Sequence, residues 1–201
     1  MSRKLYDKAR QHLKSESGTR SNPWGGRLAV ALVYPNTYHH AMSNLGFQTV
    51  YHLLNSRDDA LCERFFLPDP DDLDEHKRTG TSLFSLESGK TLQDFDLIAF
   101  SLSFENDYLN LPVIFELGRI PWMASDREGH YPLMLAGGVC AFMNPEPLAE
   151  VMDLFAIGEA EVILPGLVEN LLAGEDRSDE FMVRLANLPG VYVPALYTPR
   201  Y

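Results

Sequence analysis

The chain has 201 residues, of which 45% are hydrophobic, so it is long enough to bury a core of its own. Its 17 Lys and Arg and 28 Asp and Glu residues give a formal net charge of −11, which argues against nucleic acid as a partner because no basic stripe is available to displace counterions. No apolar run is long enough to span a membrane, and the opening MSRKLYDKARQHLKSES contains no signal segment. We therefore expect a cytoplasmic protein with no membrane partner.

The first elements in chain order are a helix and a buried strand. Residues 1–15 have the pattern of a polar amphipathic helix, and the loop that follows, up to residue 26, is rich in Ser, Gly and Asn. The continuous apolar run LAVALVY, residues 28–34, predicts a parallel strand that is covered on both faces. An apolar stripe from Met42 to Leu54 then predicts a helix, which either Ser43 or Asn44 can cap.

Four more strands complete the pattern, at residues 61–68, 95–103, 131–138 and 153–158. Between the second and third strands, the acidic DPDDLDEHKRTG has no apolar period and predicts a solvated loop or a short helix. Further helices are predicted near Pro112, over NPEPLAEVM and over EAEVILPGLVENLLAG, where Gly174 lies just past the helix end.

Strands that alternate with helices indicate an α/β fold. We predict a Rossmann-like or flavodoxin-like three-layer sandwich with a five-stranded parallel sheet and right-handed crossovers, preceded by an N-terminal helix. The predicted divisions are residues 1–26 for the helix and loop, 27–175 for the sandwich, and 176–201 for a linker. The linker is expected because NLPGVYVPALYTPRY is apolar and interrupted by prolines, with no helix or strand of its own to complete.

The strand ends are where a ligand is expected, because open α/β sheets bind ligands beyond the carboxyl ends of their strands. These ends are polar or rich in glycine here, at residues 34–37, 101–105, 137–138 and 158–159. The pair Gly137-Gly138 has no capping role to explain it, so we expect it to contact a ligand. Asn144 precedes Pro145 and Pro147, which leaves the amide of Glu146 as the donor for its side chain.

Two motifs resemble binding sites, but structural roles explain them better. ESGKT, residues 87–91, ends like a phosphate-binding loop, but Phe84 stands where that motif needs Gly and the segment precedes a strand, so a surface turn is expected. No G-x-G-x-x-G follows the first strand, which argues against a dinucleotide site. His39 and His40 diverge and lack further ligands nearby, which favours a structural or capping role over contact with a ligand.

The remaining reactive side chains form no catalytic or metal-binding set. Cys62 and Cys140 are the two cysteines, far apart in apolar runs, and are expected to be buried free thiols. Glu159 and Glu161 are expected in the first turn of a helix, where the dipole favours negative charge. We therefore predict no catalytic residue and no metal ligand in this chain.

Five segments taken together carry a family resemblance. They are ALVYPNTYHHAMSNLGFQTVYHLLN, ERFFLPDPDD, LFSLESGKTLQDFDLIAFSLSFENDYLNLPVIFELGRIP, AGGVCAFMNPEPLAE and DLFAIGEAE. This combination resembles the N-terminal cobalamin (vitamin B12)-binding-type domain of radical SAM proteins, in a large bacterial subfamily, over roughly residues 23 to 197. The resemblance implies a domain that binds cobalamin and presents it to a radical SAM barrel downstream, so the chain would not be catalytic alone and its parent would be a radical SAM enzyme.

The resemblance also implies which residues would touch the cofactor. The matching positions are Tyr34, Asn36, Thr37, Ser101, Ser103, Glu105, Gly137, Gly138, Gly158 and Glu159. The cluster motif C-x-x-x-C-x-x-C is absent, so a [4Fe-4S] cluster and S-adenosylmethionine are expected only in a downstream part missing from this chain. One type of cobalamin domain carries a D-x-H-x-x-G motif after its first strand, and the His of that motif binds cobalt. The matching positions here are Asn36-x-Tyr38-x-x-Ala41, so cobalamin would bind without that His ligand.

A second hypothesis stays open at this point. The same fold could serve as a scaffold or interaction domain of a radical SAM protein that has lost cobalamin. An open slot beside the sheet above Gly137-Gly138 would favour the cofactor hypothesis. Bulky side chains filling that slot, such as Phe104, Phe142 or Tyr38, would favour the scaffold. A stand-alone enzyme of flavodoxin-like shape is disfavoured, because no nucleophile and base stand out as a pair.

Overall fold

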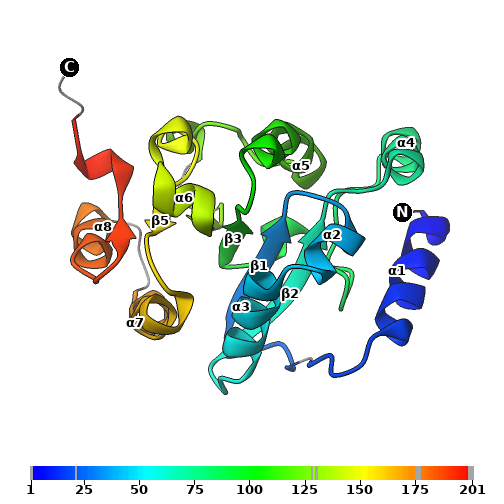
Figure 1. The fold of residues 1–201 in the computed structure, drawn as a ribbon, viewed down its shortest axis with the longest axis horizontal. Helices are drawn as coiled ribbons and strands as arrows, with labels where there is room; N and C mark the ends of the chain where they lie inside the picture. The colour runs from blue at the N-terminus through cyan, green and yellow to red at the C-terminus, as the bar shows by residue number, and fades with distance from the viewer. Residues whose placement is uncertain (1, 21, 128, 130, 175–177, 199–201) are drawn as a thin grey trace.

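One six-stranded sheet forms the centre of the molecule, in the strand order β2-β1-β3-β4-β5-β6 (Figure 1). The computed structural model describes residues 2–20, 22–127, 129, 131–174 and 178–198. The strands are β1 (Leu28–Tyr34), β2 (Ala60–Phe66), β3 (Leu97–Ser101), β4 (Leu133–Gly137), β5 (Leu154–Ala156) and β6 (Val191–Tyr192). The first five are parallel, and β6 runs antiparallel to β5.

Helices cover both faces of the sheet, as the α/β prediction requires. The α-helices are α1 (Arg3–Ser15), α2 (Tyr38–Met42), α3 (Leu45–Asn55), α4 (Pro70–Thr79), α5 (Leu111–Gly118), α6 (Val139–Met143), α7 (Ala160–Ala173) and α8 (Asp179–Ala186). Helices α3, α7 and α8 pack on one face of the sheet, and α5 and α6 pack on the other. All seven residues of β1 are buried because they alternate between these two cores, which explains the continuous apolar run.

The α/β fold class is confirmed and the five predicted parallel strands form, but the sheet has a sixth, antiparallel strand, which lies in the segment predicted as a linker. The segment after residue 177 contains α8 and β6, and β6 joins the sheet through the Ile157 amide, which donates to the Gly190 carbonyl at 2.7 Å. A two-residue strand is too short to show a sequence period, so only its burial against the sheet reveals it. The predicted boundary at residues 175 and 176 lies outside the described residues.

The segment between α6 and β5 agrees with one prediction and differs from another. The Asn144 side chain accepts from the Glu146 amide at 3.2 Å, as expected. The predicted helix over NPEPLAEVM is wrong, since only one 3-10 turn forms there, at Glu146–Leu148. The backbone bonds there join residues three apart, such as the Ala149 amide to the Glu146 carbonyl at 3.1 Å, and Pro147 has no amide hydrogen to donate to a helix.

The outer edge of β2 is sealed by side chains and a hairpin. The amide and carbonyl of Cys62 both bond the Asn55 side chain, at 3.0 and 2.9 Å. The amide of Arg64 donates to Glu87 at 2.7 Å, and its carbonyl accepts from the Leu86 amide at 2.8 Å. The turn over ESGKT is therefore confirmed as a turn, and it covers an edge that would otherwise attract another strand.

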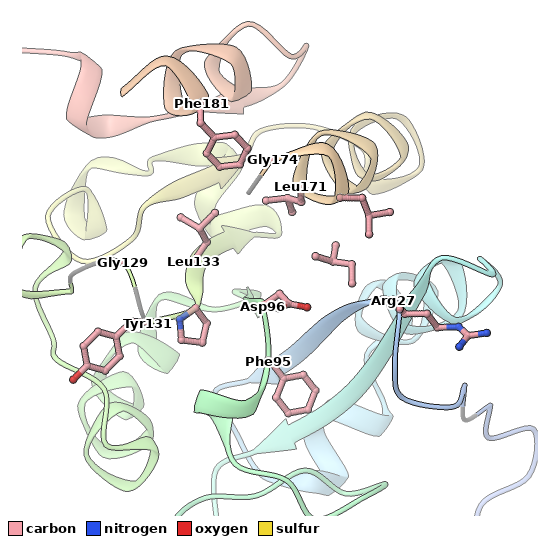
Figure 2. Close-up of a pocket in the computed structure, with 13 residues that line it drawn as sticks. Arg27, Phe95, Asp96, Gly129, Tyr131, Leu133, Leu171, Gly174 and Phe181 are labelled. Carbon is pink, nitrogen blue, oxygen red and sulfur yellow. The ribbon is translucent and has the colours of Figure 1, made fainter. Parts of the chain in front are cut away.

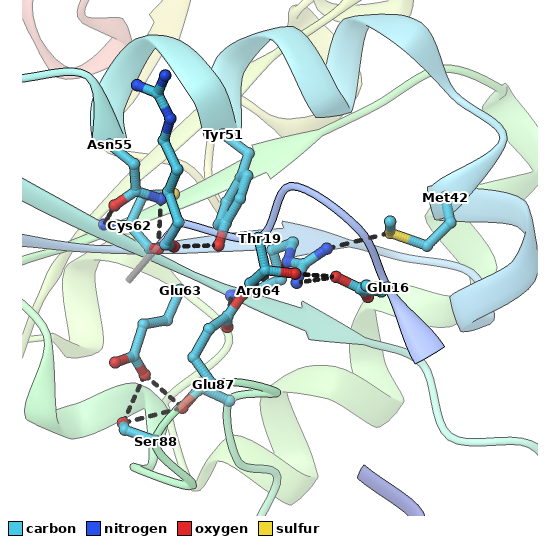
Figure 3. Close-up of polar contacts among 12 residues, drawn as sticks. Glu16, Thr19, Met42, Tyr51, Asn55, Cys62, Glu63, Arg64, Glu87 and Ser88 are labelled. Atoms are coloured by element: carbon cyan, nitrogen blue, oxygen red, sulfur yellow. Dashed lines mark hydrogen bonds and ion pairs between the residues drawn. The ribbon is translucent and has the colours of Figure 1, made fainter. Parts of the chain in front are cut away.

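A buried charge cluster fastens the N-terminal segment to this edge (Figure 3). The Arg64 guanidinium bonds Glu16 through Nη2 and Glu87 through Nε, each at 2.7 Å, and lies 4.4 Å from the centre of the Tyr51 ring. The side chains of Arg64, Glu16 and Glu87 are 3%, 8% and 3% exposed. Burial raises the pKa of Glu87, although the Arg64 charge acts in the opposite direction. Each of the three charges therefore depends on its partners for compensation.

We expect Arg64→Met to lower the free energy of unfolding by about 3–5 kcal/mol, because it leaves two buried carboxylates without their cation. Urea denaturation monitored by circular dichroism measures the loss. Arg78→Met is the control, because it breaks an ion pair to Glu75 in which the Arg78 side chain is 71% exposed, and it should cost less than about 1 kcal/mol. Equal losses in the two variants would contradict the role given to Arg64.

Candidate functional site

A groove of about 810 Å³ opens between α3 and α7, on the face of the sheet that these helices share. It exists because the segments that connect β2 to β3 and β3 to β4 place their helices away from this face, so the carboxyl half of β3 has no helix directly over it. The groove runs over β1, β3, β4 and β5, with Val30 and Leu97 at its deep end and the strand ends at its mouth.

The floor of the groove is made of small residues at the strand ends. Ala99 and Ser101 on β3, Gly137 on β4, and Ala156 and Gly158 at the end of β5 all line it. They face the same side of the sheet because side chains alternate along a strand. Larger side chains at these positions would fill the space between the two helices, so the floor keeps the groove open.

Six of the ten positions expected to touch a cofactor line this groove, namely Ser101, Ser103, Gly137, Gly138, Gly158 and Glu159. The other four, Tyr34, Asn36, Thr37 and Glu105, are not among its lining residues. The Tyr34 side chain is 2% exposed and packs edge-on against Phe47. The Thr37 hydroxyl bonds His40, with 2.9 Å between Oγ1 and Nδ1, and Glu105 begins a 3-10 turn.

The loops after β1 and β3 are tied together, which explains why the groove is not centred on them. Asn36 Nδ2 donates to Asp107 Oδ1 at 2.8 Å, Asn44 Nδ2 donates to Ser103 Oγ at 3.0 Å, and Asn110 Nδ2 donates to the Pro35 carbonyl at 2.8 Å. The strand order reverses between β1 and β3, where α/β proteins usually bind ligands. Here the bonds from Asn36 and Asn110 join the two loops at that point, and the groove lies beside this tie, between α3 and α7.

The sequence prediction missed several residues of the groove. Asn44 was expected only as a helix cap; it does cap α3 by accepting from the Phe47 amide at 2.9 Å, and its amide nitrogen also reaches Ser103. Ala99 and Ala156 were not singled out at all. Their signal was the small residues repeated at every second position near the ends of two strands, Ala-x-Ser and Ala-x-Gly.

Gly137 and Gly138 are glycines for different physical reasons. Gly138 has a φ of 99°, and a Cβ there would lie 2.6 Å from the carbonyl oxygen of Leu102. The backbone at Leu102 therefore explains Gly138 without a ligand, while contact between a ligand and Gly138, which lines the groove, stays a prediction. A Cβ on Gly137 would lie 3.6 Å from the Ala156 Cβ, an ordinary contact, and would project over the groove floor.

Bulky aromatic residues stand at the mouth of the groove and do not fill it. Phe104 and Phe142 are 61% and 58% exposed. Tyr38 lies elsewhere, where it stacks on His12 with 4.0 Å between ring centres and donates to Glu16 at 2.9 Å. Burial, followed by the bond to Glu16, raises the pKa of Tyr38 to about 12. The slot above Gly137 is thus open.

Metal-ligating side chains do not cluster in the part of the chain that the structure describes. No group of three or more His, Cys, Asp or Glu side chains could hold a metal ion among the described residues. Cys62 and Cys140 are buried free thiols, as expected, and burial raises the pKa of both. Within the same residues, no helix is long and apolar enough to cross a membrane.

A second cavity, of about 450 Å³, lies at the amino ends of the strands (Figure 2). Part of its polar lining is engaged in structural bonds, since Asp96 accepts from the Ala29 amide at 2.8 Å and Nη1 of Arg27 donates to the Pro23 carbonyl at 3.0 Å, whereas Nε of Arg27 is buried without a hydrogen-bond partner among the described residues. Figure 2 also shows the Arg27 side chain pointing away from the other lining residues. The groove at the carboxyl ends is therefore the stronger candidate.

Exchanging Asn36 and Asp107 tests the tie between the two loops. Asn36→Asp alone places a second carboxylate beside that of Asp107 and should cost about 2 kcal/mol of unfolding free energy. Adding Asp107→Asn restores a donor and an acceptor with reversed polarity, so the double variant should recover most of the loss. Urea denaturation of the two single variants and the double variant gives the coupling energy, and additive losses would contradict the bond.

Alanine substitution at each glycine tests which of the two is required by a close approach of the backbone. Gly138→Ala should lower the unfolding free energy by about 2 kcal/mol or more, because the methyl group meets Leu102 at a positive φ. Gly137→Ala should change it by less than about 1 kcal/mol, since its Cβ has room. Thermal or urea unfolding of both variants measures the difference, and a reversed order would overturn this account.

Comparison with known proteins gives the family. A family model described as "Radical SAM proteins, N-terminal" matches residues 46–194. The uncharacterized protein MJ0966 of Methanocaldococcus jannaschii is 27% identical over 133 residues, which are 66% of this chain and 24% of that protein, so the chain spans about a quarter of its length.

Two solved structures of TsrM, a radical S-adenosylmethionine methyltransferase from Kitasatospora setae, also match. The one with tryptophan substrate and a SAM analog has 18% identity and a TM-score of 0.46, over 83% of this chain and 28% of that one. The one with cobalamin and a [4Fe-4S] cluster has 17% identity and a TM-score of 0.48, over 83% and 29%. Likeness at these scores carries no argument about function. The family match covers most of the chain, and on that ground this chain belongs to the family of radical SAM N-terminal domains.

Proposed function

We propose that this chain is the cofactor-binding domain of a larger radical SAM protein and that its groove takes the nucleotide tail of cobalamin. The observation that carries the proposal is the open groove of about 810 Å³ at the carboxyl ends of β3, β4 and β5. Its size lies within the range of cofactor and ligand pockets, roughly 300–1,000 Å³. Membership of the radical SAM N-terminal family supplies the class of protein.

The residues of the groove fit an elongated group with an apolar part and a polar part. The deep end is apolar, and the floor at Gly137 and Ala156 has no side chain larger than a methyl group. The mouth carries hydrogen-bonding groups that would hold the polar part, on Asn44, Ser101 and Ser103. When bound, cobalamin would supply a cobalt centre for transfer of an organic group.

No protein imidazole is available beside the groove to serve as a cobalt ligand. None of its described lining residues is a histidine. His40 bonds Thr37, and His39 lies 5.9 Å from His12 between ring centres. This supports the expectation that cobalamin binds without a His ligand of the D-x-H-x-x-G type. The [4Fe-4S] cluster and S-adenosylmethionine would belong to another part of the parent protein.

An exposed apolar rim surrounds the mouth of the groove. Leu45, Phe104, Val139 and Phe142, all of which line the groove, are 81%, 61%, 55% and 58% exposed. Apolar rims of this kind usually mark an interaction site. We propose that the radical SAM barrel of the same protein covers this rim, so that the cofactor lies between the two domains. A cytoplasmic location and a bacterial origin stay predictions.

The alternative is a scaffold domain that has lost the cofactor, which the exposed rim and the missing His ligand also suit. Binding separates the two. Purified protein incubated anaerobically with cobalamin should retain about one equivalent after gel filtration, measured by the corrin absorption bands. A well-folded protein that retains no corrin would reject the cofactor hypothesis and favour the scaffold.

Gly137→Leu places a bulky side chain on the groove floor and should weaken cobalamin binding at least about tenfold, or about 1.4 kcal/mol. Gly137→Ala is the matched control, because its methyl group has room and leaves most of the groove open. Equilibrium dialysis gives both dissociation constants, and circular dichroism checks that both variants fold. Equal binding by wild type and Gly137→Leu would place the cofactor outside this groove.

A further inference from the structure

The groove has a polar mouth and an apolar deep half. Its polar side chains lie at strand ends, on the first half of α3 and at the start of α7, on Asn44, Thr49, Ser101, Ser103, Glu159 and Glu161. The described lining residues of the deep half are aliphatic, and they include Val30, Leu32, Leu54, Leu97, Leu135 and Leu164. Each of these six residues is 8% exposed or less. The described part of the deep half therefore offers a ligand no polar side chain.

The backbone in the deep half is already hydrogen-bonded. Val30, Leu97 and Leu135 each pair with a strand on both sides, because β1, β3 and β4 are inner strands of the sheet. Leu54 lies near the end of α3, where its carbonyl accepts from the Arg57 amide at 3.2 Å. A polar atom inserted here would lose its bonds to water and gain none from the protein, which weakens binding.

The base at the end of the nucleotide tail is the part of a cobamide that would meet these side chains. In cobalamin this base is 5,6-dimethylbenzimidazole, whose outer edge is a hydrocarbon ring with two methyl groups. In another cobamide adenine takes its place, and the six-membered ring of adenine carries two ring nitrogens and an amino group. Corrin, ribose and phosphate are the same in both, so the two ligands differ in the polarity of the base and carry the same phosphate charge past the mouth.

We propose that the deep half of the groove makes this chain selective for cobamides with an apolar base over cobamides with a purine base. The inference rests on the proposed function, because it names the ligand class of the same groove. The aliphatic side chains between α3 and α7 determine the specificity, since they accept the methyl groups of one base and leave the nitrogen atoms of the other without partners.

Three corrinoids test this selectivity in their dicyano forms, in which cyanide keeps the base off the cobalt. They are cobalamin, the adenine-bearing cobamide, and cobinamide, which lacks the nucleotide. Equilibrium dialysis followed by corrin absorption should give a dissociation constant at least about tenfold higher for the adenine cobamide than for cobalamin, because its polar atoms stay unpaired. Cobinamide should also bind at least about tenfold more weakly than cobalamin, because it leaves the deep half empty.

Val30→Thr gives the deep half a hydroxyl group that can pair with a polar base, so it should lower the ratio of the two cobamide dissociation constants at least about threefold. Val33→Thr is the matched control. Both valines lie on β1 and are 0% exposed, but Val33 packs in the core on the other face of the sheet. The control should leave the ratio unchanged, and circular dichroism checks that both variants fold.

A wild-type ratio near one, or an equal change of the ratio in the two variants, would overturn the inference even if cobalamin binds. Binding of cobinamide as tight as that of cobalamin would place the base outside the groove and would overturn the inference as well. A folded protein that binds none of the three corrinoids would overturn the proposed function together with the inference.

Discussion

The Arg64 guanidinium, held between Glu16 and Glu87, is the interaction on which the first third of the structure depends. It joins an edge strand, the segment after α1 and the hairpin before β3, and all three charges are removed from water. Burying a charge is unfavourable unless its partners are in place, so the three segments can pack in few other ways. The sheet therefore ends at β2, and this edge is not available to pair with another strand.

The groove follows from the way in which the connections are distributed over the two faces. Helices α3 and α7 share one face but belong to different crossovers, and the connections on either side of β3 lie on the opposite face. Small residues at the ends of β3, β4 and β5 keep the resulting space free of side chains. Asn36 and Asn110 tie the loops after β1 and β3 to each other, and the groove lies beside this tie, over β1, β3, β4 and β5.

The sequence predicts the candidate-site residues correctly where their position follows from the strand to which they belong. Ser101, Gly137 and Gly158 lie on the groove because the carboxyl ends of parallel strands meet at one edge, and a sequence that locates the strands also locates their ends. It failed where the role depends on a partner distant in the chain. Asn36 is engaged by Asp107, and Gly138 is required by the Leu102 carbonyl, neither of which any local pattern indicates.

The sequence by itself determined the α/β class, the positions of five strands, the bond from the Glu146 amide to Asn144 and the free thiols, because these follow from periodicity and from residues close together in the chain. Tertiary structure alone decided the sixth strand, the sealed edge at β2, the tie between the loops after β1 and β3 and the groove between α3 and α7. The physical reason is that these features depend on contacts between separate segments of the chain, and the pattern of one segment alone does not record its contacts with another.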